Sequence, residues 1–390
     1  MDKNNNLNIA FQTFSAKAGA GISVFQSLLP AISKVDKKNK YFVFIGEDQR
    51  EILDTIPEQY TKIIFKGVPK NPYIRILWEQ ILLPYYFKKY SIDLLYSVGN
   101  TTILFAPCKI LLFVENINPF SKVIQSWTLK EKIRNKLLYF LTYLSSKRAN
   151  RIRFCSHRSK DIINKKFRLD PRKSFVLYHG LRENWFEDSN KIQSPFPFNY
   201  ILSVSVVAPH KNLEALIEGF SILKNKNQYS GKLVIVGDTC YENYFNQLKK
   251  MITKLSLEDH ILFTGKIPNE NLKVYYKQCD LFIFPSLEET FGIPLIEAMA
   301  CSAPIIASDG MHYQSLFIPF NEIGKDYVLY FDPYSSKDLA EKIEFVLANR
   351  NKFVKKLTDD KKKKMETFSI KKIAEKLVME FENCFKGDTQ

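Results

Sequence analysis

Two glutamates, Glu289 and Glu297, lie eight positions apart in the segment SLEETFGIPLIEAMACSAPIIASD, on either side of a short Phe-Gly-Ile-Pro turn. Pro294 suits the first position of a helix, because the N–H group that proline lacks would have no intrahelical partner there. Such a helix ends near Ser302 and carries Glu297 close to its start, with Glu289 in the preceding loop. Its free N–H groups and dipole favour an anion. Two carboxylates beside it predict a ligand with phosphate and hydroxyl groups, although a capped core helix with a solvated glutamate gives the same pattern.

A lysine occupies a comparable position earlier in the same half. The segment YILSVSVVAPHKNLEALIEGF places Lys211 after an apolar strand and at the start of a helix. A lysine there can neutralise a phosphate, while the helix start supplies N–H donors. A surface lysine at a helix start is the alternative.

The elements that must position these residues alternate between strand and helix. Short apolar runs separated by helical spans favour parallel β-α-β units. The strands predicted in the first half are residues 7–11, 41–45, 63–65, 93–96, 109–114 and 151–155. Residues 128–148 predict a long helix whose apolar side either belongs to the core or touches a bilayer interface, and the core is favoured.

The segment KIQSPFPFNY, rich in proline and polar residues, predicts a linker, and a second alternating series follows it. Two such series predict an α/β protein with two Rossmann-like, doubly wound domains that face each other across a cleft. The predicted domains are residues 1–190 and 200–370. Residues 371–390 are expected to form a C-terminal helix that packs back on the first domain.

Length and composition agree with a two-domain globular protein. The 390 residues are 45% hydrophobic and 25% charged, values that are ordinary for such proteins. No run of about 18 uncharged apolar residues is present, so we expect no membrane-spanning helix. The first residues lack the apolar stretch of a signal peptide. Six cysteines without metal-ligand spacing indicate reduced thiols in a cytoplasmic protein.

The net charge of +16 is unevenly distributed. Residues 1–195 hold 32 Lys and Arg against 16 Asp and Glu, whereas residues 196–390 hold 25 of each. Residues 121–182 alone hold 17 basic and 3 acidic residues, a net charge of +14. Such a field attracts anionic partners, for which an acidic membrane surface, an anionic acceptor or nucleic acid would qualify. The usual nucleic-acid-binding motifs are not found, so nucleic acid is not expected. A merely solvated basic face is the remaining alternative.

Residues 200–347 resemble the donor-binding domain of the group 1, family 4 retaining glycosyltransferases of the GT-B class. The Glu-x7-Glu element stands inside matching flanks, from YILSVSVVAPHKN to YFDPYSSKDLAEKIEFVL. The first half resembles the family more loosely, in AKAGAGISVFQSLL, RILWEQILLP, IDLLYSVGNTT, LLFVENINPF, RIRFCSHRSKDI and VLYHGL.

This resemblance implies roles for individual residues. Lys211 would contact the donor diphosphate, and Glu289 would lie beside the transferred sugar. Glu297 would accept hydrogen bonds from the ribose hydroxyls. The backbone N–H groups that would approach the sugar and phosphate are those of Phe291, Gly292 and Ile293.

In the first domain the resemblance implies a glycine loop and an acceptor-side segment. Gly19 and Gly21 would form the loop that faces the donor, because close backbone approach to a phosphate needs residues without side chains; a simple turn is the alternative. Glu115 and Asn116 stand where the family often has a histidine or a His-Asp pair. Glu115 could accept a hydrogen bond from a sugar hydroxyl.

The sequence also differs from the family pattern at the expected phosphate site. The family often carries an arginine five residues before the lysine, and this chain has Val206 there. Arg182 or another basic residue of the first domain would then have to compensate.

The function that the resemblance implies is retaining transfer of a sugar from a nucleotide-sugar to a glycan or lipid-linked acceptor, in cell-surface polysaccharide or lipopolysaccharide assembly. No cofactor or metal is expected, since the chain has no Asp-x-Asp signature. We expect a cytoplasmic protein, either free or peripheral on the inner face of the membrane. A phosphorylase or epimerase of the same architecture is one alternative. A catalytically reduced glycan- or membrane-binding relative is another, given Val206 and Asn116.

Overall fold

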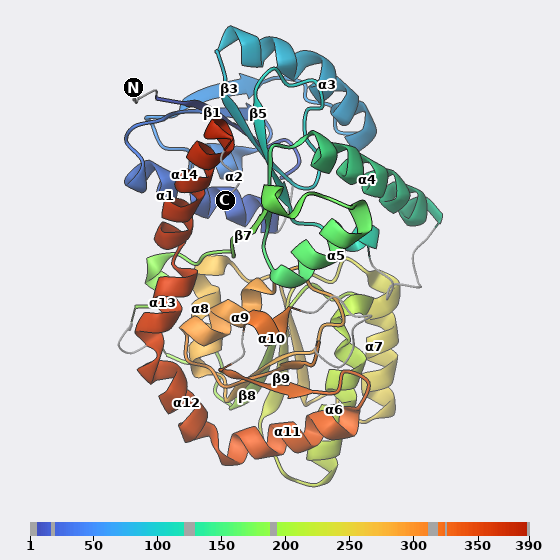
Figure 1. Ribbon diagram of the computed structural model, residues 1–390. Coiled ribbons are helices and arrows are strands. Elements are labelled where there is room, and N and C mark those ends of the chain that lie inside the picture. The colour runs from blue at the N-terminus through green and yellow to red at the C-terminus, as the bar shows by residue number, and fades with distance from the viewer. Residues whose placement is uncertain are drawn as a thin grey trace. The chain divides into compact units, whose positions relative to one another are not determined.

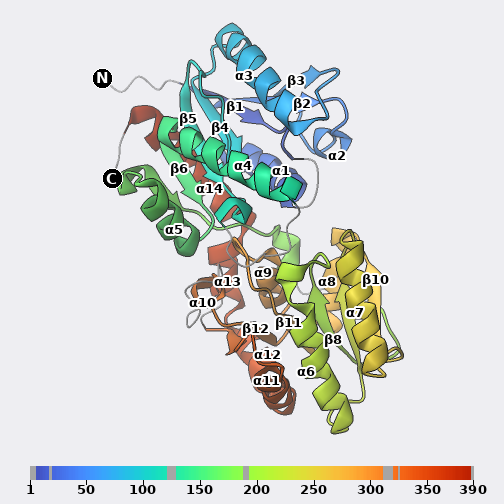
Figure 2. The same ribbon diagram turned by 90° about the vertical axis from the view of Figure 1, so that its right-hand side faces the viewer.

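The computed structural model describes residues 6–16, 20–120, 129–187, 193–310, 319–323 and 326–387 (Figures 1 and 2). Its contacts divide the chain into two compact units. The first unit holds the described residues up to 120, residues 129–182 and the C-terminal residues from 369 onward. The second unit holds Glu183–Phe368. Each unit is described by itself.

The first unit is built on a seven-stranded parallel sheet with the order β3-β2-β1-β4-β5-β6-β7. Its strands are β1 (Asn8–Gln12), β2 (Lys40–Gly46), β3 (Thr61–Phe65), β4 (Leu94–Val98), β5 (Lys109–Val114), β6 (Arg151–Phe154) and β7 (Ser174–Val176). Its α-helices are α1 (Ala20–Val35), α2 (Arg50–Leu53), α3 (Pro72–Lys89), α4 (Leu129–Arg148), α5 (His157–Phe167) and α14 (Ile370–Lys386).

The last helix of the chain belongs to the core of this first unit. α14 lies beside α1 (Figure 1) and buries an apolar stripe that includes Leu377 and Phe381. The Phe381 ring packs against Phe11 and Tyr96, with ring centroids 6.2 and 5.6 Å away. An ion pair between Glu380 and Arg151 of β6 joins α14 to the sheet as well.

The second unit is built on a six-stranded parallel sheet with the order β10-β9-β8-β11-β12-β13. Its strands are β8 (Tyr200–Val204), β9 (Lys232–Val236), β10 (Ile261–Gly265), β11 (Leu281–Phe284), β12 (Ile305–Ser308) and β13 (Val328–Phe331). Its α-helices are α6 (Leu213–Asn225), α7 (Glu242–Lys254), α8 (Asn269–Gln278), α9 (Ile293–Ala300), α10 (Phe320–Ile323), α11 (Ser336–Ala348), α12 (Arg350–Asp359) and α13 (Lys361–Phe368).

The central strands of the second sheet are covered by other elements on both faces. β8 and β11 are buried along their whole length, as expected for parallel strands covered on both faces. In both sheets the strand order reverses beside the first strand, between β1 and β4 and between β8 and β11. The predicted α/β class with two doubly wound parallel sheets is therefore confirmed. The facing of the two domains across a cleft stays a prediction.

None of the helices in the described part of the chain has the length and apolar content needed to span a bilayer.

Candidate functional site

The point where the strand order reverses marks the candidate site of the second unit. Ligands of open α/β sheets bind outside the carboxyl ends of the strands at this switch point. β8 and β11 pair in parallel there, with Leu281 opposite Ile201. The loops that follow these two strands carry Lys211 and Glu289, so the topology brings together two segments that lie 78 residues apart in the sequence.

A short 3-10 turn, η4 (Pro209–Lys211), places the lysine between β8 and α6. Asn212 ends this turn with a left-handed backbone (φ 55°), and its side chain donates to the carbonyl of Pro333 over 2.8 Å. The N–H of Leu287 donates to the carbonyl of His210 over 2.8 Å and fixes the two loops to each other. The position of Lys211 is therefore held from both sides.

Lys211 and Glu289 form a partly buried ion pair. Lys211 Nζ donates to Glu289 Oε1, and the Ser286 hydroxyl donates to the same oxygen over 3.3 Å. Lys211 is only 8% exposed, and its Nζ lies 5.8 Å from the centre of the Phe284 ring. Burial, with the neighbouring Lys211 charge as a second cause, lowers the pKa of His210 to about 3. His210 is therefore neutral near pH 7, and Lys211 supplies the positive charge of this loop.

Gly292 opens the helix that follows the two-glutamate loop. Its φ of 93° is a left-handed conformation that glycine adopts without strain. A Cβ at this position would lie 2.8 Å from Cε1 of Phe320 and 3.0 Å from Cε1 of Phe284, so the backbone packs too closely for a side chain. α9 then begins at Ile293, with Pro294 in its first turn as predicted. The free N–H groups at a helix start are the kind of donors that bind anions in proteins.

Glu297 projects from α9 and is almost fully buried, with 9% exposure. The hydroxyl of Tyr276, on α8, donates to Glu297 Oε2 over 2.8 Å. Burial raises the pKa of Glu297 to about 7, and the Tyr276 hydrogen bond opposes that rise. A buried carboxylate with one oriented oxygen and a pKa near neutrality suits hydrogen bonding to hydroxyl groups of a ligand.

The second unit thus brings together a lysine with its carboxylate partner, a helix start and a buried acid. Phe291, which precedes Gly292, is buried at 2% exposure and supports the turn. Phosphate oxygens fit the first two features, and hydroxyl groups fit the carboxylates.

In the first unit, Gly21 lies in the first turn of α1, where a Cβ would come within 3.3 Å of the Cα of Ala16. Gly19 lies outside the described residues. The segment before α1 follows β1, and the loop with Gly99 follows β4, so both flank the switch point of this sheet. The Ser15 hydroxyl donates to the carbonyl of Val98 across that point over 3.2 Å.

Glu115 and Asn116 follow β5 at the carboxyl edge of the first sheet. The side-chain oxygen of Asn100 accepts the N–H groups of both residues, over 2.9 and 2.8 Å. Glu115 Oε1 lies 3.7 Å from Nε2 of His179. Burial raises the pKa of Glu115 to about 7, although the positive charge of Arg153 acts in the opposite direction. Burial also lowers the pKa of His179 to about 3, so this histidine is neutral.

The two residues connected with the missing arginine lie in different units. Val206 is half-buried in the loop after β8. Arg182 is exposed, and its Nε donates to the Ser27 hydroxyl of α1 over 3.3 Å.

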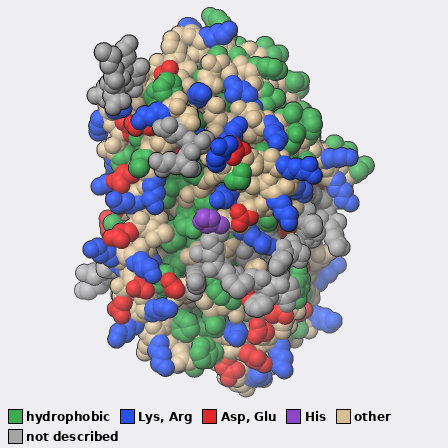
Figure 3. Space-filling model, in the orientation of Figure 1, with side chains coloured by type: hydrophobic (Ala, Val, Ile, Leu, Met, Phe, Trp, Pro, Cys, Tyr) green, Lys and Arg blue, Asp and Glu red, His purple; other side chains and the backbone are tan. Residues whose placement is uncertain are grey.

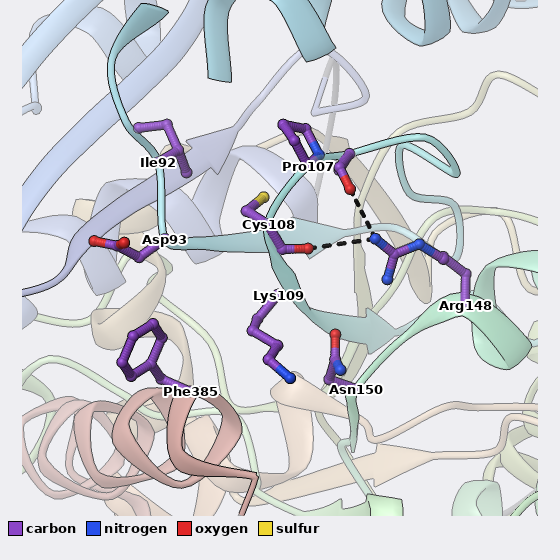
Figure 4. Close-up of a pocket in the computed structure, with 9 residues that line it drawn as sticks. Ile92, Asp93, Pro107, Cys108, Lys109, Arg148, Asn150 and Phe385 are labelled. Atoms are coloured by element: carbon purple, nitrogen blue, oxygen red, sulfur yellow. Dashed lines mark hydrogen bonds between the residues drawn. The ribbon is translucent and has the colours of Figure 1, made fainter. Parts of the chain in front are cut away.

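A cavity of about 590 Å³ opens at the opposite edge of the first sheet (Figure 4). Asp93 and Lys109, at the amino ends of β4 and β5, line it together with Phe385 of α14. Arg148 reaches into it from α4 but donates to the carbonyls of Ala106 and Cys108, over 2.7 and 3.4 Å. The cavity is therefore remote from the carboxyl edge where ligands of such sheets bind.

Sequence reasoning missed Tyr276, Ser286 and His179. Each is a partner of a predicted residue, and Tyr276 comes from another helix, 21 residues away from Glu297. Within the described residues, no group of three or more His, Cys, Asp or Glu side chains is placed to hold a metal ion.

Solved structures similar to this chain over nearly its whole length include glycosyltransferases. The chain is similar over 98% of its length to the whole of a glycosyltransferase structure from Rickettsia africae, with a TM-score of 0.76 and 19% identity. It is similar over 97% of its length to the whole of Anabaena Alr3699/HepE in complex with UDP-glucose, with a TM-score of 0.73 and 16% identity. The fold is therefore the GT-B glycosyltransferase fold.

The sequence match is more specific. Residues 185–364, which include the candidate site of the second unit, match the model of the family described as glycosyl transferases group 1. The chain is also 30% identical over 236 residues to the O-antigen chain mannosyltransferase RfbU of Salmonella typhimurium. That match covers 58% of this chain and 61% of the relative, less than two thirds of its length. The resemblance to group 1 glycosyltransferases is thus confirmed.

Proposed function

We propose that the protein is a retaining glycosyltransferase that moves a sugar from a nucleotide-sugar donor to a glycan or lipid-linked acceptor, in cell-surface polysaccharide or lipopolysaccharide assembly. The observation that carries this proposal is the pairing of Lys211, in the turn before α6, with Glu289, in the loop that leads into α9, at the switch point of the second sheet. The likeness to an O-antigen mannosyltransferase supports the reaction class, and the UDP-glucose complex of the Anabaena protein supports a nucleotide-sugar donor.

The chemistry follows from where charge develops. When the bond from the anomeric carbon to the diphosphate breaks, negative charge grows on the phosphate oxygens, and groups that neutralise it accelerate the step. Lys211 Nζ and the N–H groups of Gly292 and Ile293 serve this role. Without donor, Glu289 is the counter-ion of Lys211. The diphosphate takes over that role, and Glu289 then accepts a hydrogen bond from a hydroxyl of the transferred sugar.

Glu297 binds the nucleoside part of the donor. Its carboxylate accepts hydrogen bonds from the two ribose hydroxyls, and Tyr276 holds it in the orientation that allows this. We propose further that transfer needs no divalent metal ion, because Lys211 and the start of α9 supply the positive charge.

The first unit supplies the acceptor side. Gly19 and Gly21 let the backbone approach the donor phosphates, and Glu115 with Asn116 contacts a sugar. Arg182 replaces the positive charge that is missing at Val206.

Transfer to a lipid-diphosphate-linked glycan tests the proposal. The full chain is incubated with UDP-, GDP- and dTDP-sugars, and the anomeric configuration of the product is read from NMR coupling constants. We expect one donor to be used with retention of configuration. An inverted product contradicts the retaining reaction, and binding of a donor without turnover identifies a catalytically reduced relative.

A further inference from the structure

The helix α3 of the first unit exposes a continuous apolar face. Ile74, Leu77, Ile81 and Tyr85 recur at the spacing of one helix face, and all four are exposed. Leu77 and Ile81 are 64% and 79% exposed. The opposite side of the helix belongs to the core of the unit, because Leu83 and Phe87 on that side are fully buried. Such a face on a soluble unit marks an interaction surface.

A second apolar face lies on α4. Its exposed large apolar residues are Leu129, Ile133, Leu137, Phe140 and Tyr143. The other side of the helix belongs to the core, where Tyr139 packs on Phe167 with ring centroids 5.1 Å apart. The sequence favoured a core role for this helix, but the structure divides its apolar residues between core and surface.

The two helices hold the same loop between them. Gln80 of α3 accepts the N–H of Leu104 over 2.8 Å, and Arg148 of α4 donates to the carbonyl of Leu104 over 3.0 Å. The next residue, Phe105, is 78% exposed. The helices lie next to each other in Figures 1 and 2. The exposed apolar residues of α3, of α4 and Phe105 together are called the α3–α4 surface.

Basic side chains accompany this surface. Among the side chains that the structure describes on the two helices, the exposed basic ones are Lys88, Lys89, Lys132, Arg134, Lys136 and Lys147. The acidic residue of α3, Glu79, is buried beneath it, where it accepts from Gln12 over 2.7 Å and pairs with Arg75 over 3.2 Å. On α4, Glu131 is half-buried. In Figure 3, hydrophobic and basic side chains are interspersed at the upper right, over α3 and α4.

We infer that the α3–α4 surface docks the protein on a lipid bilayer that contains anionic lipids. Apolar side chains on a helix face enter the boundary between headgroups and acyl chains, while flanking lysines and arginines pair with lipid phosphates. The surface offers both features on the same two helices. The excess of basic residues between 121 and 182 thereby gains a structural context, because most of the exposed cations named above belong to α4.

Charge favours a bilayer over a second copy of the chain. In a two-fold symmetric dimer, this surface would meet itself, and the lysines of one copy would lie against those of the other. Like charges at an interface oppose association, whereas an anionic leaflet neutralises them.

Vesicle co-sedimentation of the full chain tests the inference. Binding should appear with phosphatidylcholine vesicles that contain phosphatidylglycerol, be absent with phosphatidylcholine alone, and weaken as salt rises. Absence of binding to the anionic vesicles at low salt overturns the inference.

Variants on the surface locate the contact. Each lysine near an anionic surface contributes about fivefold in affinity, so Lys132→Glu with Lys136→Glu should weaken binding by about 25-fold or more. Lys352→Glu with Lys355→Glu on α12 changes the net charge equally and should change binding by less than about threefold. Equal losses in the two pairs would mean that overall charge, not this surface, drives binding.

An apolar pair separates docking from association between copies. Leu77→Asn with Ile81→Asn should weaken vesicle binding by about tenfold or more, since two inserted side chains are lost, whereas Phe345→Asn on α11 should not. Circular dichroism and the melting temperature show whether each variant folds. If the apolar double variant does not fold, the comparison of the two Lys→Glu double variants still tests the inference. Sedimentation that shows a wild-type dimer, dissociated by the apolar pair, would overturn the inference by identifying an interface between copies.

Discussion

The buried acid Glu297 makes donor binding depend on pH. Its pKa is raised to about 7, mainly by burial. A carboxylate accepts hydrogen bonds from two ribose hydroxyls better when ionised, so donor affinity should increase as the pH rises through neutrality. Tyr276 and Cys301, the two titratable groups that interact with Glu297, do not change charge between pH 6 and 8. The pKa of Tyr276 is raised well above 10, that of Cys301 is raised to about 12, and that of His210 is lowered to about 3. Lys364, whose Nζ donates to the carbonyl of Met299 on α9, has its pKa lowered by burial to about 8 and therefore loses part of its charge between pH 6 and 8.

The expected magnitude follows from the ionised fraction of Glu297. With a pKa of about 7, about a tenth of the side chains are ionised at pH 6 and about nine tenths at pH 8. The apparent dissociation constant scales inversely with the fraction of binding-competent protein. The donor should therefore bind about tenfold more tightly at pH 8 than at pH 6.

Calorimetric titration with a nucleotide-sugar measures the pH dependence of donor affinity. The diphosphate of a nucleotide-sugar is esterified at both ends, so its charge stays constant between pH 6 and 8. Glu297→Gln should bind more weakly and show no such pH dependence. Tyr276→Phe removes the hydrogen bond that lowers the pKa of Glu297, so its titration should move to higher pH. An unchanged pH profile in Glu297→Gln would refute the role given to this carboxylate.

The site and the fold yield further predictions. Lys211→Ala should lower kcat by about 100-fold and raise KM less, because the phosphate charge grows in the transition state, and Lys254→Ala on α7 is the matched control in steady-state kinetics. Activity should persist in EDTA, and loss of turnover that Mg²⁺ or Mn²⁺ restores would contradict the metal-free chemistry. Gly292→Ala should lower the free energy of unfolding by about 2 kcal/mol in denaturant titration, because its φ of 93° and the Phe320 contact leave no room for a side chain. At pH 8, Glu297→Gln should raise that free energy by up to about 3 kcal/mol, since the cost of burying the charge begins near the unfolded pKa and is complete above about pH 7.

Local patterns sufficed for the elements that build the site. The start of α9 could be predicted because Pro294 restricts the backbone to a conformation that suits the first turn of a helix, an effect that depends on the local sequence alone. The strands β5 and β8 were also predictable from the local sequence, because strands that are covered on both faces consist almost entirely of apolar residues.

Other features depend on contacts between distant segments. β7 has only three residues, too few for a periodic signal, and it forms because β6 offers a free edge. The pairing of Tyr276 with Glu297 requires α8 and α9 to pack side by side, which no local pattern specifies. Likewise, the division of α4 between core and surface follows from what packs against it.

The most direct test of the donor site is calorimetry of UDP-, GDP- and dTDP-sugars with the full chain and two variants. The wild type should bind at least one of these donors. Glu297→Ala should weaken that binding by about 1–3 kcal/mol, because the ribose hydroxyls lose a charged acceptor. Glu344→Ala, which removes an exposed carboxylate from α11, should bind as the wild type does. If no nucleotide-sugar binds, or if Glu297→Ala binds its donor as tightly as the wild type, the second unit does not hold the donor in the way proposed.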